Sequence, residues 1–230
     1  MTNSLKVTCL SLCTIAVLTA CGGGGSDSTS TPVTSFPLEA GYKALVTAGY
    51  SANYTVSGTC TGTATTTTAS PVTSSFEGSA ALAVTSTLTA SFTNCTPASL
   101  ALPGQNFYDS NYNLLGTVAS TAYAKFLTPI AAIPSSVKAG DTALLGTEIV
   151  YIDSSKTVSA GKVDFSYVVA ADTVTTAFVT LILSSYSASN QLILTQQVKY
   201  RIAADGSLTI VSIDLQFSTT STTHLALTKV

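Results

Sequence analysis

Tryptophan is absent from this chain of 230 residues, histidine occurs once, and charged side chains make up only 9% of it. Because lysine and arginine form no run, the chain lacks the electrostatic footprint of a nucleic-acid-binding protein. The absence of tryptophan argues against a sugar-binding platform, which usually recruits it. The one histidine, His224, is the only candidate base for a Ser-His-Asp or Cys-His device, and no G-x-S-x-G motif accompanies it. These deficits exclude nucleic acid as a partner and disfavour an enzyme.

Serine and threonine supply the polar character instead, at about three residues in ten. The long helix formers glutamate, lysine and arginine are scarce, whereas threonine and valine suit the pleated surface of a sheet. The composition therefore favours β-strands.

The first twenty residues have the pattern of a secretory signal peptide. Lys6 is the only charged side chain among them, residues 7–18 are predominantly apolar, and the small residues Thr19 and Ala20 follow. The apolar run is shorter than the ~20 residues that a transmembrane helix needs. We therefore expect residues 1–20 to be removed on export.

The end of this segment, Leu18-Thr19-Ala20-Cys21, resembles the lipobox of bacterial lipoproteins. The resemblance implies cleavage before Cys21, diacylation of its thiol and, because Gly22 rather than aspartate follows, export to the outer membrane. Two or three acyl chains on one residue hold a protein firmly, since each buried methylene contributes ~0.8 kcal/mol. Residues 22–35 then read as a flexible tether that spans on the order of 20 Å. We expect the membrane to be a partner through this anchor.

The resemblance also sorts the five cysteines. Cys9 and Cys13 leave with the signal peptide and Cys21 is consumed by lipid, so that Cys60 and Cys95 remain in an oxidising compartment. Two such thiols usually pair, and we predict a Cys60–Cys95 disulfide rather than two buried free thiols. Its contribution would be roughly 3–4 kcal/mol in the chain-entropy model. No cysteine is then left for a zinc site with the single histidine.

Residues 36–230 are predicted to form one all-β domain with a short helix at its start. Apolar side chains recur at helical spacing within 36–48, at Leu38, Tyr42, Leu45 and Val46. Alternation with a period of two then predicts a strand through 54–64 and a long strand through 76–92, bent or interrupted near Thr85-Ser86. Residues 98–116, with Pro103-Gly104 and Asp109–Asn113, have the composition of a turn-rich connection.

The second half alternates more regularly. It predicts six strands, at 146–153, 162–170, 173–185, 191–203, 207–218 and 223–230. Asp205-Gly206 between two alternating strands is a strong hairpin signal, and residues 178–183, apolar on both faces, indicate a central strand. An antiparallel meander of roughly ten strands must close into a barrel or fold into a sandwich to cover its edges.

Several patterns resemble functional sites without completing them. Asp109, Asn111 and Asn113 alternate as calcium-loop ligands do, but Leu114 and Ser120 stand where the turn glycine and the closing glutamate belong, so that a surface turn is expected. The S-x-x-K matches Ser135/Lys138 and Ser159/Lys162 lack a helix and a K-T-G partner. Asp164 and Asp172 could serve glycoside chemistry in principle, but their spacing fits strand ends and turns. No catalytic residue, cofactor or metal site is predicted.

Three functions remain open at this point. The first is a non-enzymatic envelope lipoprotein with a structural or interaction role, whose partner would be another envelope protein. The second is a carrier module whose curled sheet encloses an apolar ligand, which an internal cavity would support. The third is an envelope hydrolase that uses His224.

Overall fold

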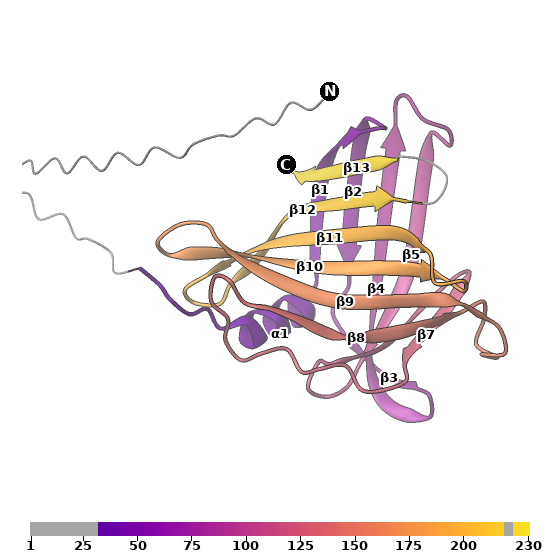
Figure 1. Ribbon diagram of the computed structural model, residues 1–230, viewed down its shortest axis with the longest axis horizontal. Helices are drawn as coiled ribbons and strands as arrows, with labels where there is room; N and C mark the ends of the chain where they lie inside the picture. The colour runs from indigo at the N-terminus through magenta and orange to yellow at the C-terminus, as the bar shows by residue number, and fades with distance from the viewer. Residues whose placement is uncertain (1–31, 219–222) are drawn as a thin grey trace, which may run out of the picture. The chain divides into compact units, whose positions relative to one another are not determined.

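The computed structural model describes residues 32–218 and 223–230 (Figure 1). The signal peptide, Cys21 and most of the tether expected from the sequence lie outside the described residues. The described elements, in chain order, are α1 (Leu38–Ala48), β1 (Tyr50–Gly58), β2 (Gly62–Thr68), β3 (Val72–Phe76), β4 (Ser79–Phe92), β5 (Ser99–Tyr108), β6 (Leu114–Ala119), β7 (Ala122–Phe126), β8 (Thr142–Tyr151), β9 (Ser159–Ala171), β10 (Thr176–Ser187), β11 (Leu192–Ala203), β12 (Leu208–Phe217) and β13 (His224–Lys229).

Twelve of these strands close into an antiparallel barrel. Neighbours pair in the order β2-β1-β13-β12-β11-β10-β9-β8-β7-β6-β5-β4, and the ring closes where β2 pairs with the second half of β4, from Gly62↔Phe92 to Thr68↔Ser86. Closure removes the unpaired edges of an open sheet. In Figure 1, β8 to β13 run across the view and β1, β2, β4 and β5 run steeply, so that opposite walls cross at a wide angle. The predicted all-β class with one short helix is confirmed. Of the two architectures expected from the sequence, the structure has the barrel and not the sandwich.

The strand β3 lies outside the ring, where it pairs with the first half of β4. Phe76 stacks on Phe107 of β5, with ring centroids 4.7 Å apart. In the turn that follows, the Glu77 carboxylate accepts bonds from Lys125 Nζ at 2.6 Å and Lys156 Nζ at 2.8 Å, and also from the Tyr123 hydroxyl. These three donors lower the pKa of Glu77 to about 2. The β3–β4 turn is thereby fixed to the outer wall over β7.

The continuous strand predicted through 54–64 is wrong. The chain reverses between Gly58 and Gly62, and β1 pairs with β2 across this turn. Gly58 has φ 107°, and a Cβ there would lie 2.3 Å from the carbonyl oxygen of His224, so that only glycine fits. Gly58, Cys60 and Gly62 continue the period of two through this turn, so that the sequence pattern resembles one uninterrupted strand.

The other two expectations for the first half also need correction. The predicted long strand is interrupted at Glu77-Gly78, both with positive φ, rather than near Thr85-Ser86. Residues 98–116, expected as a turn-rich connection, instead form β5 and the start of β6, with a turn only between them, and Pro103-Gly104 lies within β5. At Pro103 the strand pairs with β4 alone, because β6 joins only from Gly104 onward. Proline is tolerated in a strand that has one unpaired side.

The six strands predicted for the second half are confirmed as β8 to β13. The Asp205-Gly206 turn joins β11 to β12, and the Ser207 N–H donates to Asp205 Oδ1 at 2.9 Å. In β10 the inward positions are apolar as expected, but the outward ring of Phe178 is covered by the cationic side chains of Lys199 and Arg201.

The helix α1 closes one end of the barrel. Its four predicted apolar residues all face the interior, and the Glu39 N–H at its start donates to the Pro134 carbonyl at 3.1 Å. Gly41 lies against the β11–β12 turn so closely that a Cβ would come within 1.9 Å of the Gly206 oxygen. Residues 127–141 lie beside the helix, where Phe36 and Val137 form a β-bridge. No helix among the described residues combines the length and the apolar character needed to cross a membrane.

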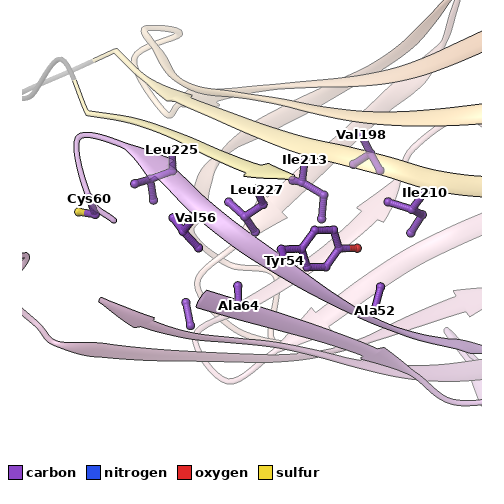
Figure 2. Close-up of a cluster of buried hydrophobic side chains, with 11 residues drawn as sticks. Ala52, Tyr54, Val56, Cys60, Ala64, Val198, Ile210, Ile213, Leu225 and Leu227 are labelled. Atoms are coloured by element: carbon purple, nitrogen blue, oxygen red, sulfur yellow. The ribbon is translucent and has the colours of Figure 1, made fainter. Parts of the chain in front are cut away.

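Part of the barrel interior is solidly packed. Side chains of β1 and β2 meet those of β11, β12 and β13 across the barrel, with the Tyr54 ring at the centre (Figure 2). The Tyr54 and Thr66 hydroxyls are hydrogen-bonded at 3.1 Å, which satisfies both polar groups in this core. The predicted disulfide is confirmed: Cys60 in the β1–β2 turn is bonded to Cys95 in the β4–β5 turn, with Cα atoms 5.7 Å apart.

Candidate functional site

The remainder of the barrel interior is hollow. It encloses a cavity of about 750 Å³, lined by α1 and by inward side chains from the barrel wall, mostly leucine, valine, isoleucine, alanine and aromatic residues. This volume is within the range of sites that hold small molecules, ~300–1,000 Å³. It is about five times the ~150 Å³ apolar cavity that admits one benzene, which suggests room for on the order of 20–30 non-hydrogen atoms.

The cavity is closed at one end and open at the other. At the closed end, Leu38 and Tyr42 of α1 lie with Ile130 and Ile133 of the adjoining segment. At the far end, Leu100 and Leu102 line the cavity and yet are 36% and 52% exposed. Both side chains point inward from the first half of β5, beside the β4–β5 turn. They mark an apolar opening.

One carboxyl group, that of Glu148 on β8, lies in the cavity wall. Register places Glu148 opposite Val163 of β9, an inward position, because a bulge near Leu144 shifts the alternation of β8. The residue is only 3% exposed, and its Oε1 atom has no hydrogen-bond partner among the described residues. Burial raises the pKa of Glu148 to about 7, although hydrogen bonding from Thr117 acts in the opposite direction. A buried carboxyl with one oxygen that has no hydrogen-bond partner, and with a pKa near neutral pH, marks a candidate functional site.

Polar groups extend from Glu148 along one side of the cavity. Thr117 of β6, whose hydrogen bonding lowers the pKa of Glu148, donates its own hydroxyl to Asn106 Oδ1 at 3.2 Å. Burial raises the pKa of Tyr108, and hydrogen bonds with Tyr42 and Asn106 partly offset this rise. Burial likewise raises the pKa of Tyr42 and Tyr200 well above the usual value. The cavity thus combines a large apolar surface with a polar strip that ends at an unpaired carboxyl oxygen, and its other polar lining residues, among them Thr66, Ser86 and Gln196, are uncharged.

The positive charges of the barrel lie outside this cavity. Among the described residues that line it there is no lysine, arginine or histidine. Lys125 and Lys156 pair with Glu77, Lys162 pairs with Asp164, and Arg201 pairs with Asp172. Glu148 therefore has no cation to neutralise it.

His224, the candidate base, lies elsewhere. Its Nε2 atom is 2.7 Å from Asp214 Oδ2 of β12, and both side chains are substantially exposed. Neither residue lines the cavity. The arrangement supplies an oriented imidazole on the wall of the barrel, outside the cavity.

The two S-x-x-K matches form structural contacts. The Ser159 hydroxyl accepts the Gly161 N–H at 3.2 Å, while Lys162 lies over the Tyr186 ring at 4.7 Å. The Lys138 N–H donates to Asp141 Oδ2 at 2.9 Å and so belongs to a turn after Ser135.

The acidic candidates are equally separated. Asp164 accepts a bond from Thr147 within the sheet, and Asp172 binds Arg201 just beyond the end of β9. Eight residues of extended strand put them about 26 Å apart, whereas glycosidase carboxylates are ~5–9.5 Å apart.

Asp109 forms a turn, as expected, in which its Oδ1 atom accepts the N–H groups of Asn111 and Asn113 at 2.8 and 2.9 Å. No cluster of three or more His, Cys, Asp or Glu side chains occurs in the part of the chain that the structure describes.

Sequence reasoning missed Glu148. Residues 146–151, Gly-Thr-Glu-Ile-Val-Tyr, place apolar side chains on both faces of β8, so alternation alone does not say which face is inward. The register with β9, which depends on the bulge, decides it. The available signal was a single glutamate within a strand whose neighbours are mainly apolar.

A comparison of the chain with protein-family models, with curated proteins and with solved structures found no match.

Proposed function

We propose that this protein is an envelope lipoprotein that binds an apolar small molecule inside its barrel. The observation that favours this role is the cavity of about 750 Å³, mostly apolar and open at Leu100 and Leu102. A barrel with only a structural role would be more stable with this space filled, because each missing methyl group costs about 1 kcal/mol. Buried apolar side chains from β1, β2, β12 and β13 fill another part of the same barrel, around the Tyr54 ring.

The size of the cavity sets the expected affinity. A ligand of about 25 non-hydrogen atoms that gains about −0.3 kcal/mol per atom binds with about −7.5 kcal/mol, which corresponds to a Kd in the low micromolar range. Such an affinity suits reversible capture and release.

Binding can be tested with N-phenyl-1-naphthylamine, an uncharged probe that fluoresces in apolar surroundings. We expect saturable, one-to-one binding that Ala122→Phe weakens at least tenfold, because Ala122 lines the cavity. The matched control is Ala101→Phe on β5, whose side chain is exposed and lies outside the cavity. Absence of binding, or equal loss in both variants, would contradict the proposal and favour a structural or interaction role.

The envelope location rests on Leu18-Thr19-Ala20-Cys21. Cells that express the full chain and grow with radiolabelled palmitate should label the wild type and not Cys21→Ser. Label retained in that variant would place the acylation at another residue, and absence of label from the wild type would refute the lipid anchor.

A further inference from the structure

We infer that the cavity selects apolar ligands whose polar end is a hydrogen-bond donor, such as a long-chain primary alcohol or amine, and that Glu148 receives this donor. Long-chain carboxylates, by contrast, are rejected. This inference rests on the proposed ligand-binding role of the barrel and specifies which class of ligand it takes.

The hydrogen-bond acceptor, the Glu148 carboxyl, lies in the cavity wall. Glu148 projects into the cavity from β8, with apolar Phe126 opposite it on β7 and Val163 opposite it on β9. Its Oε1 atom is buried and has no hydrogen-bond partner among the described residues. A buried polar atom without a partner destabilises the empty protein, so a ligand that supplies a donor removes this cost on binding.

The Glu148 carboxyl can accept a hydrogen bond in both of its protonation states. A carboxylate accepts hydrogen bonds at both oxygens, and a protonated carboxylic acid still accepts at its carbonyl oxygen. A hydroxyl donor is therefore served in either protonation state, and an ammonium donor gains an ion pair when Glu148 is ionised. An acceptor-only head group would face a group that offers a donor in only one of its two states.

The charge of the cavity lining around Glu148 disfavours an anionic ligand. The described lining contains no cation, and its titratable side chains other than Glu148 are tyrosines. A ligand carboxylate would be buried beside a carboxyl group without a counter-ion, and the desolvation of its charge would oppose binding. Fatty-acid sites need the opposite arrangement, a cation or several donors around the carboxylate.

The test compares three ligands with the same chain: dodecan-1-ol, dodecan-1-amine and dodecanoate, each used to displace N-phenyl-1-naphthylamine at micromolar concentration. In wild-type protein we expect the alcohol and the amine to displace the probe at concentrations at least tenfold lower than dodecanoate. The amine should also bind more tightly as the pH rises from 5.5 to 8, whereas the alcohol should change little. Dodecanoate that binds as tightly as the amine would overturn the inference.

Two variants separate the role of Glu148 from the shape of the cavity. Glu148→Leu should bring the affinities of the alcohol, the amine and dodecanoate to within about threefold of one another, each measured against the affinity of the same variant for the probe. Glu148→Gln keeps an acceptor oxygen and should retain the alcohol but lose the tighter binding of the amine at pH 8. Preference that survives in both variants would refute the assignment. If the probe binds and the three ligands do not differ, the head-group selectivity fails alone, whereas absence of probe binding defeats the binding role as well.

Discussion

Replacing Glu148 by glutamine should raise the unfolding free energy, relative to the wild type, by more at pH 8 than at pH 5. The wild-type carboxyl lies 3% exposed in the barrel, where burial raises its pKa from 4.5 to about 7. Between these two values the folded state holds a proton that the unfolded state has lost. The unfolding free energy therefore falls as the pH rises through this window. Glutamine has nearly the same shape and does not ionise, so it removes this dependence.

The magnitude follows from the two pKa values. At 1.36 kcal/mol per pH unit, ionisation of Glu148 costs about 3 kcal/mol well above pH 7. At pH 5 most of this cost is absent, because the carboxyl is protonated in the folded state and partly protonated in the unfolded state. The difference in stability between the glutamine variant and the wild type should therefore change by about 2–3 kcal/mol between pH 5 and pH 8.

Urea unfolding of both proteins, followed by circular dichroism at half-unit pH steps, measures this difference. Any pH-independent cost of the amide shifts the whole curve and leaves its slope intact. The carboxylates with lowered pKa, including Glu77, titrate below pH 4.5 and do not enter this window. A difference that stays flat from pH 5 to pH 8 would refute a buried carboxyl without a neutralising cation at this position.

Three further predictions concern the scaffold. Replacing Cys60 and Cys95 together by alanine should lower the unfolding free energy by about 3–4 kcal/mol, measured by urea unfolding, and an unchanged midpoint would contradict the linkage of the two turns. Gly41→Ala should destabilise by about 1–3 kcal/mol despite the better helix propensity of alanine, because the new Cβ would meet the Gly206 oxygen at 1.9 Å; a stabilised variant would show that α1 is not seated there. Glu77→Gln should lower stability at neutral pH by about 1 kcal/mol, given solvent screening, and should remove the loss of stability that the wild type shows as the pH falls from 4.5 to about 2; a retained acid limb would count against the ion cluster.

The sequence predicted those parts of the fold in which local pattern and tertiary role agree. Leu38, Tyr42, Leu45 and Val46 recur at helical spacing because one face of α1 covers the cavity, and the hairpin chemistry of Asp205-Gly206 acts locally. The first half was harder. The turn at Gly58 preserves a period of two, so alternation continues across a reversal of the chain that only the pairing of β1 with β2 reveals.

The candidate site was less predictable than the fold. A cavity is a property of the closed ring, since its lining comes from residues spread from Leu38 to Leu225. Glu148 faces inward because a bulge shifts the register of β8, and burial alone raises its pKa near neutrality. The Cys60–Cys95 bond, by contrast, could be predicted because the lipobox resemblance and the oxidising compartment left a single pair.

A crystal structure of the protein, from crystals grown with 12-bromododecan-1-ol, would show directly whether the hollow part of the barrel receives a ligand. We expect continuous density for the ligand's alkyl chain inside the barrel, an anomalous bromine peak within it, and the ligand hydroxyl within hydrogen-bonding distance of Glu148. A barrel interior filled by its own side chains, with bromine peaks only on the outer wall, would contradict this expectation.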